Sequence, residues 1–199
     1  MRSTRLLIIV ALMAAGGVAV LWLRSGPDAS QFAHLREPRL TRLSDQRMLV
    51  VEAAGDPNVV GASAFTLLFS TYFRLDGVSR IERPRAPRAR WQAQQDTPKD
   101  KWLGQYALPL PDSVVAPPTE STGAPQARIT TWVYGDVAEI LHVGPYSAEQ
   151  PDIERLLHFI NSRGYRAVGE HEEEYVKGPG MMFSGDPEQY LTIIRLRVE

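Results

Sequence analysis

A run of acidic residues beside a tyrosine is the part of this sequence whose residue types could do chemistry. Glu172, Glu173 and Glu174 are followed directly by Tyr175. A carboxylate that moves from water into an apolar, aromatic-lined environment is costly unless it is paired. A lipophilic cation would supply the missing charge, and each aromatic face would add about 0.5–2 kcal/mol of cation–π attraction. The residue types therefore favour a ligand pocket over a reaction centre.

Glu174 is the acid that we expect in this pocket. If the segment is a strand, its side chains alternate, so that Glu172 and Glu174 share one face while Glu173 and Tyr175 share the other. A solvated acidic strand is the competing interpretation. Aromatic residues that could line the pocket are more often packed in a core. The candidate ligand-binding residues are Glu174, Tyr175, Trp132, Tyr134, Tyr146, Tyr106 and Phe183.

Other chemical signals are weaker. There is no cysteine, which excludes disulfides, cysteine nucleophiles and thiolate metal sites. His142 and His158 invite a haem or metal interpretation, but no second ligand has supportive spacing, so we predict no metal site and no cofactor. No nucleophile, base and acid stand together, so no catalytic residue is assigned and enzymatic activity is left open.

The elements that must position these residues are clearest in the second half of the chain. Alternating apolar residues predict strands over 129–134 and 137–143. Four apolar residues spaced i, i+3, i+4 and i+7 predict a helix from about Gln150 to Arg163, with one apolar stripe against a sheet. Alternation from 192 to 198 predicts a half-exposed terminal strand.

The first half follows a similar plan, with a strand over 48–53, an apolar helix around 64–72 and two hairpin strands, about 89–94 and 102–110. Arginine- and proline-rich residues 80–90 indicate a solvated loop, with phosphate or anionic-lipid binding as the alternative.

The two halves can be laid over each other. Leu67 lies twelve residues after Gly55, and Leu156 lies twelve residues after Gly144. A coincidence between two ordinary strand–helix units is the alternative explanation. We predict an α+β fold of two β-α-β-β repeats, about 47–112 and 126–199, with pseudo-two-fold symmetry. The expected sheet is antiparallel, with the helices packed on one side.

From Met48 to the C-terminus the chain resembles the GyrI-like small-molecule-binding family, also called bacterial transcription-activator effector-binding domains. The resemblance rests on the segment His142-Val143-Gly144-Pro145-Tyr146 before the helix, on Glu174-Tyr175, on the strand after Asp186-Pro187, and on the tandem halves. It implies a ligand groove between two repeats. It also implies that a glutamate of the last repeat, by position Glu174, contacts cationic aromatic ligands.

Three other functions stay open. Some GyrI-like proteins are hydrolases of reactive small molecules, in which case Glu174 would act as acid or base with a neighbouring tyrosine. SOUL-type haem-binding proteins resemble this fold too. A protein-interaction module that presents a sheet edge or groove is the third possibility.

The N-terminal residues differ in kind from the rest. Arg2 and Arg5 precede an uncharged apolar run, residues 6–23, which as a helix would span roughly 27 Å of a bilayer core of about 30 Å. We predict a transmembrane signal anchor over 1–24; a cleaved signal peptide is the rival interpretation and a buried soluble helix is the third. A linker over 25–46 and a ligand-binding domain over 47–199 follow it.

This organisation predicts a single-pass membrane protein with its domain on the outer, periplasmic side. Basic residues at both ends of the apolar run bias the orientation only weakly. The formal net charge is −1, which argues against nucleic acid as a partner. The sequence leaves the ligand and the oligomeric state open.

Overall fold

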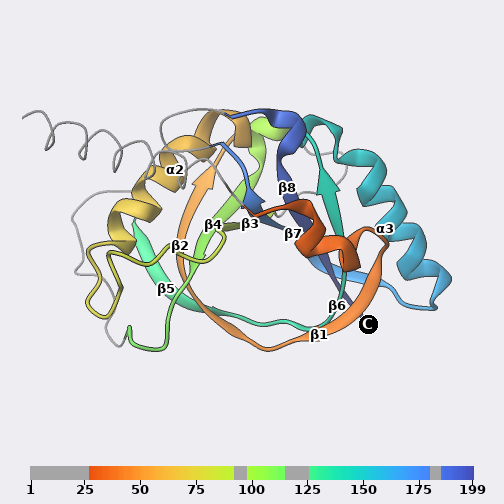
Figure 1. Cartoon of the computed structure of the whole chain (residues 1–199), viewed down its shortest axis with the longest axis horizontal. Coiled ribbons are helices and arrows are strands. Elements are labelled where there is room, and N and C mark those ends of the chain that lie inside the picture. Colours follow the sequence, from red (N-terminus) through yellow and green to blue (C-terminus); the bar gives the residue numbers. More distant parts are fainter. Residues whose placement is uncertain (1–26, 92–97, 115–125, 180–184) are drawn as a thin grey trace, which may run out of the picture.

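The structure, a computed structural model, describes residues 27–91, 98–114, 126–179 and 185–199. It is an α+β fold in which eight described strands form one sheet in the order β1-β6-β8-β7-β3-β4-β2-β5 (Figure 1). All neighbouring strands are antiparallel, as predicted. The strands are β1 (Arg39–Leu43), β2 (Gln46–Ala54), β3 (Arg88–Trp91), β4 (Leu103–Pro109), β5 (Ala127–Trp132), β6 (Gly135–Val143), β7 (Ala167–Lys177) and β8 (Leu191–Val198).

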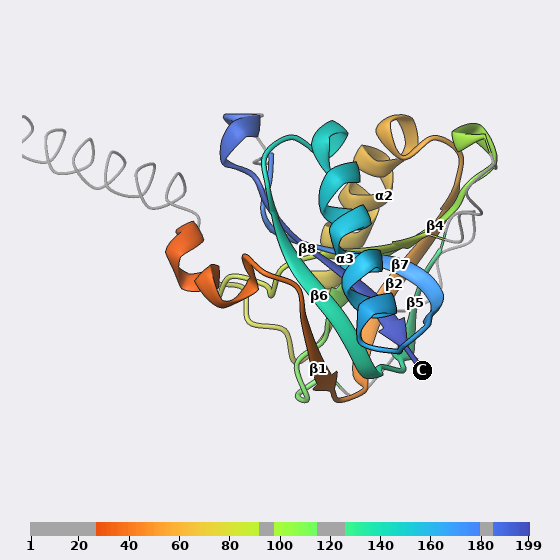
Figure 2. The same ribbon diagram turned by 90° about the vertical axis from the view of Figure 1, so that its right-hand side faces the viewer.

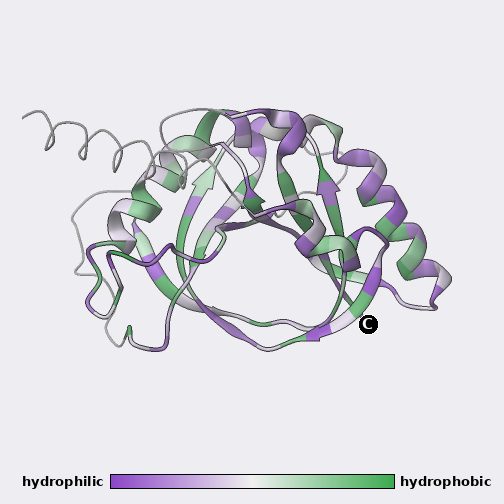
Figure 3. Ribbon diagram, in the orientation of Figure 1, coloured by the Kyte–Doolittle hydropathy of each residue, from purple (hydrophilic) through white to green (hydrophobic). Residues whose placement is uncertain are grey.

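Two α-helices lie on one side of this sheet (Figure 2), α2 (Pro57–Tyr72) and α3 (Gln150–Ser162). Asp56 caps α2 by accepting a hydrogen bond of 2.9 Å from the backbone N–H of Asn58. Helix α2 contacts β2 and β4, and α3 contacts β6. In the strand order, β3 and β7 therefore lie between the strands that α2 contacts and the strand that α3 contacts. Helix α2 is apolar on most of its surface, whereas α3 is amphipathic, as its spacing predicts (Figure 3).

The two halves contain the same elements in the same spatial order. The first half runs β2-α2-β3-β4 and the second β6-α3-β7-β8. In each half the last strand lies between the other two, and the halves meet where β3 pairs with β7. The expected sheet with helices on one side is therefore present. The pseudo-two-fold axis and the duplication stay predictions.

A bent two-stranded ribbon joins the outer ends of the sheet. Arg39 pairs with Glu139 in the β1–β6 ladder, and Gln46 pairs with Trp132 in the β2–β5 ladder, so both ladders share one continuous register. At the bend between them, the Asp45 carboxylate accepts a hydrogen bond of 3.1 Å from the backbone N–H of Tyr134. Because β2 also pairs with β4 and β6 with β8, the ribbon closes the sheet into a ring (Figure 1).

The expected linker, residues 25–46, contains regular structure instead. Its residues 39–43 form β1, and Ala29–Leu35 form the 3-10 helix η1. Leu35 is 2% exposed and packs against Leu141 and Ile193 on the face opposite the helices, which we call the inner face. Burial of Leu35 and pairing of β1 with β6 place this segment in the domain, so the folded unit starts well before residue 47.

The predicted membrane anchor, residues 6–23, lies outside the described residues. Among the residues that the structure describes, no helix combines the length and the apolar character that crossing a bilayer requires.

Within the described ranges, three further 3-10 helices connect the main elements; they are η2 (Lys99–Lys101), η3 (Tyr146–Ala148) and η4 (Pro187–Gln189). Of these, η3 contains the tyrosine of the Gly-Pro-Tyr turn and leads directly into α3.

Candidate functional site

Strand β7 sends alternate acids to opposite faces of the sheet. Tyr175 faces the helices, where its ring lies 5.7 Å from that of Phe65 in α2. Glu173 shares this face, since the Tyr175 hydroxyl donates a hydrogen bond of 2.7 Å to its Oε2. Glu174 faces the other way and lies 2.6 Å from Nη1 of Arg195. The expected pair of Glu174 and Tyr175 is therefore separated by the sheet.

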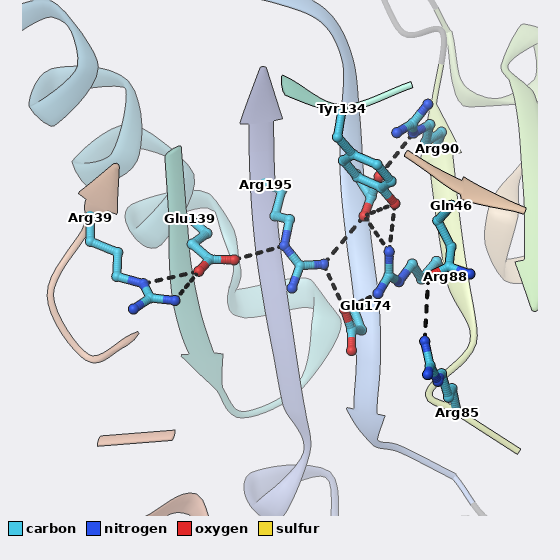
Figure 4. A network of polar contacts seen from close by, with 10 residues as sticks. Arg39, Gln46, Arg85, Arg88, Arg90, Tyr134, Glu139, Glu174 and Arg195 are labelled. Atoms are coloured by element: carbon cyan, nitrogen blue, oxygen red, sulfur yellow. Dashed lines mark hydrogen bonds and ion pairs between the residues drawn. The ribbon is translucent and has the colours of Figure 1, made fainter. Parts of the chain in front are cut away.

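The inner face holds a charge network that spans five strands (Figure 4). Glu139 binds Nε of Arg195 at 2.8 Å and Nη2 of Arg39 at 2.6 Å. Glu172 binds Nε of Arg90 at 2.9 Å. We call this set the inner charge network; it contains Arg39, Arg88, Arg90, Tyr134, Glu139, Glu172, Glu174 and Arg195.

Pairing with opposite charges keeps Arg195 and Glu139 charged. Burial alone would lower the pKa of Arg195, but the carboxylates of Glu174, Glu172 and Glu139 raise it above its usual range. Burial would likewise raise the pKa of Glu139, but Arg195 and Arg39 lower it. Glu174 also lies 3.0 Å from Nη2 of Arg88, so it has cationic partners within the protein. The inner charge network is therefore satisfied largely without a ligand.

Trp132 and Tyr134, two of the expected pocket walls, also lie on the inner face. They are 3% and 4% exposed. The Arg90 guanidinium lies 4.0 Å from the Trp132 ring centre, and the Tyr134 hydroxyl donates to Glu172 at 3.0 Å. Arg88 and Arg90 belong to β3, so this end of segment 80–90 is a buried strand and not a solvated loop.

The helix-facing side of β3 and β7 carries a second acidic group with different surroundings. The Glu173 side chain is 13% exposed, and its Oε1 lies 3.1 Å from Nε2 of His171. Burial would raise the pKa of Glu173, but the nearby His171 and hydrogen bonds from Tyr175 and Trp91 lower it. Glu173 is therefore an ionised carboxylate at neutral pH.

Aromatic side chains from both halves surround Glu173. The Tyr175 ring lies 5.4 Å from the Tyr146 ring, and the Tyr106 ring lies 5.1 Å from Phe65 and 5.3 Å from Trp91. Burial raises the pKa of Tyr106 to about 12 and that of Tyr175 well above its usual value. These phenols therefore keep their protons at neutral pH, and Tyr175 uses its proton to hold Glu173.

Glu149, which the sequence did not single out, is a second acid of this site. It precedes α3 and is 6% exposed. Burial raises the pKa of Glu149 to about 9, and the negative charge of Glu173 adds to the effect. Its carboxyl group is therefore protonated at neutral pH. In the sequence it looks like any acid at a helix start, so no local signal marks it.

Buried polar atoms without a hydrogen-bond partner gather here. Six such side-chain atoms occur among the described residues, and two of them, Arg88 Nε and Trp132 Nε1, lie on the inner face. The other four lie near Glu173 or its neighbour Glu149; they are Tyr106 Oη, Glu149 Oε1, His171 Nε2 and Thr192 Oγ1. His171 Nε2 is close to Glu173, but its N–H is poorly directed for a hydrogen bond. Unsatisfied buried groups of this kind are costly, and a polar ligand or water would satisfy them.

The glycine-proline-tyrosine turn is held by His142. Its Nδ1 lies 2.9 Å from Asp152 in α3 and its Nε2 lies 3.1 Å from the carbonyl oxygen of Pro145. Both ring nitrogens are thus engaged within the protein, whereas His158 is exposed on α3. Among the described residues no three histidine or acidic side chains form a possible metal site. Phe183, the remaining expected wall, lies outside the described residues.

Two hollows lie away from Glu173. A cavity of about 230 Å³ adjoins the inner charge network and is lined in part by Arg90, Glu172, Arg195 and Arg197. An open groove of about 550 Å³ runs beside α3, at His158. The Glu173 site is thus defined by its chemistry and not by one of these hollows.

No family model matches the sequence, and no curated protein matches it. Solved structures do share the fold. An uncharacterized conserved protein from Listeria innocua has a TM-score of 0.65 and 20% identity, over 86% of this chain and 99% of that chain. A hydrolase from Listeria innocua has a TM-score of 0.63 and 22% identity, over 85% and 96%.

The EcmrR C-terminal domain matches with a TM-score of 0.57 and 11% identity, over 82% of this chain and 97% of that domain. At these identities the likeness establishes the fold alone. The fold is consistent with the GyrI-like architecture that the sequence resembles.

Proposed function

We propose that this protein binds a small amphipathic molecule with a cationic group, and that Glu173 holds this group. One observation carries the proposal. Among the ion pairs of the described residues, Glu173 has only His171 as a partner, whereas its neighbour Glu174 has both Arg88 and Arg195. Glu173 is thus the acid of β7 whose charge a ligand could balance.

The surroundings of Glu173 suit such a ligand. Half-buried Tyr146 and Tyr175 present aromatic rings beside a carboxylate that water reaches only in part. A cation over an aromatic face gains about 0.5–2 kcal/mol, more where water is excluded. The apolar part of the ligand would lie against Phe65 and the tyrosines, which come from both halves.

The resemblance to the GyrI-like family supports a role for a glutamate of the last repeat in contacting the ligand. The proposal moves this role by one residue, from Glu174 to Glu173. The reason is strand alternation, since only Glu173 shares a face with Tyr175.

Matched variants of consecutive residues test the proposal. Binding of a panel of aromatic cations would be measured by calorimetry for wild type, Glu173→Gln and Glu174→Gln. We expect Glu173→Gln to lose at least about tenfold in affinity, roughly 1.4 kcal/mol, and Glu174→Gln to keep wild-type affinity per folded molecule. Loss of affinity in Glu174→Gln alone would return the role to Glu174. No binding to folded wild type would refute the proposal.

Hydrolysis of a reactive small molecule is the second candidate function. Glu149 keeps its proton while adjacent Glu173 is ionised, and two carboxyl groups with separated pKa values are a common acid–base pair in enzymes. The likeness to a solved hydrolase also motivates the test. Turnover of an epoxide or activated ester by wild type, abolished in Glu149→Gln and in Glu173→Gln, would support an enzyme. Absence of turnover in wild type would exclude these substrates.

We also propose that residues 6–23 attach the protein to a membrane with the domain on the periplasmic side. The uncharged apolar run between Arg5 and Arg24 is the support for this. After a carbonate wash, the full chain should stay with the membranes while residues 25–199 should not. Protease added to intact spheroplasts should digest the domain, and protection would place it on the other side.

A further inference from the structure

We propose that the Glu173 site selects cations that carry N–H groups over quaternary cations, and that Glu149 is the residue that sets this specificity. The ligand groups concerned are primary ammonium, amidinium and guanidinium ions. The inference rests on the proposed function of Glu173 and adds the chemical class of the ligand.

The position of Glu149 is unusual for a residue before a helix. A polar side chain there normally accepts a hydrogen bond from a free backbone N–H of the first turn. Glu149 makes no such bond. Its side chain instead lies beside Glu173 on the helix-facing side of the sheet and is 6% exposed. Burying a carboxyl group costs more free energy than burying an apolar side chain unless the carboxyl group is hydrogen-bonded. The Glu149 carboxyl group therefore needs a hydrogen-bond partner.

The partner that is missing is a donor. Oε1 of Glu149 is buried and accepts no hydrogen bond. Thr192, which is completely buried, lies against Glu149, and its hydroxyl forms no well-directed hydrogen bond either. Tyr106 Oη is a further unsatisfied atom near Glu173. A ligand that neutralised Glu173 but carried no N–H would leave the Glu149 oxygen unsatisfied.

Nitrogen chemistry separates the two classes of cation. An ammonium group has three N–H donors, and amidinium and guanidinium groups have several in a plane. Such a cation can donate to Glu173 and to Glu149 Oε1 together. A trimethylated nitrogen has the same charge and no donor, so it can satisfy the charge of Glu173 alone. One buried hydrogen bond made or left unmade corresponds to about a tenfold difference in affinity.

The charge around Glu149 supports a single positive charge on the ligand. Glu173 of β7, Asp152 of α3 and the polar Thr192 of β8 face Glu149, and His171 lies beyond Glu173. Asp152 is paired with His142. Burial, with Glu173 and Asp152 nearby, raises the pKa of Glu149 to about 9. At neutral pH the two acids of the site thus carry one negative charge, and the protonated carboxyl keeps an acceptor oxygen for the ligand.

A pair of probes with the same ring system tests the inference. The probes are 2-naphthylmethylammonium and its N,N,N-trimethyl derivative, measured by calorimetry against the full chain in detergent at pH 7. Wild type should bind the primary ammonium about tenfold more tightly. Glu149→Leu removes the acceptor oxygen and should abolish this preference by weakening only the primary ammonium. Glu149→Gln keeps a carbonyl oxygen and should restore the preference.

The outcomes are distinct. Equal affinity of wild type for both probes, with Glu173→Gln weakening both, would overturn the inference and leave the proposed function intact. Failure of both probes to bind folded wild type would overturn both. If Glu149→Leu weakened both probes equally while its thermal melting matched wild type, Glu149 would not set specificity. Should Glu149→Leu not fold, a preference in Glu149→Gln equal to that of wild type still supports the inference, and its loss opposes it.

Discussion

Glu173 and Glu174 are consecutive in β7, yet their carboxylates belong to different environments on opposite faces of the sheet. Glu173 accepts a hydrogen bond from Tyr175 among aromatic rings, whereas Glu174 lies 2.6 Å from Arg195 in the inner charge network. The first environment leaves a charge for a ligand to balance, and the second balances it within the protein.

Replacing Arg195 should strongly destabilise the fold. Arg195→Met removes one cationic partner from each of three largely buried carboxylates, those of Glu139, Glu172 and Glu174. Breaking a buried ion pair in this way typically costs about 3–5 kcal/mol. Urea unfolding measures the change. Arg42→Met is the control, because its pair with Asp136 is solvent-exposed and should contribute little. Similar effects of both variants would contradict a structural role for the network.

The stability of the protein should depend on pH through Glu149. Its pKa of about 9 in the folded protein lies above the 4.5 of an ordinary glutamate side chain. The group therefore contributes stability that is fully present below about pH 4.5 and is lost as pH rises to about 9, because the unfolded chain releases this proton first. Glu149→Gln cannot titrate, so it should gain stability relative to wild type between pH 5 and pH 9. Urea unfolding at several pH values measures this. A constant difference would argue against a protonated Glu149.

Gly104→Ala should disturb the site through Trp91. A Cβ at residue 104 would lie 2.5 Å from Cζ3 of Trp91, so the indole must move, and with it the hydrogen bond to Glu173. We expect a shifted tryptophan fluorescence spectrum and weaker binding of aromatic cations. Gly61→Ala is the matched control, since its Cβ would make ordinary contacts with Tyr106 inside helix α2. Unchanged fluorescence and affinity in Gly104→Ala would show that Trp91 does not position Glu173.

Removal of residues 1–45 should destabilise the domain, whereas removal of residues 1–26 should not. The longer deletion removes β1 from the edge of β6, and it uncovers Leu141 and Ile193 by removing Leu35. The shorter deletion leaves all of these contacts in place. Thermal melting and light scattering compare the two fragments. Equal melting temperatures would mean that β1 and η1 add no stability.

Periodic elements could be predicted from the sequence, and elements that depend on distant partners could not. Helix α3 and strands β6 and β8 follow clear apolar spacing, and they form where expected. The expected half-exposure of β8 is wrong, because Arg195 is buried in the inner charge network and only Arg197 of this strand is exposed. Strand β1 has only five residues and alternates weakly, so its character depends on pairing with β6, far along the chain. The sequence of an edge strand that is this short and this weakly alternating resembles the sequence of a linker.

The candidate site shows the same division. Alternation along β7 correctly indicated that Glu173 and Tyr175 share a face. It could not indicate which face holds arginines, because Arg88 and Arg195 reach Glu174 only through the registers of β3 and β8 with β7. Glu149 could not be found at all, since its burial results from packing between α3 and the sheet.

The ribbon of β1–β2 and β5–β6 has a consequence for synthesis on the ribosome. Arg39 pairs with Glu139, a residue 100 positions later in the chain. Ribosomes add about 5–20 residues per second, so β1 is synthesised roughly 5–20 s before its partner strand β6. Neither half can complete its hydrogen bonding alone, so ring closure is expected late in folding. The shortness of β1 and its two arginines limit wrong pairing while the nascent strand is unprotected.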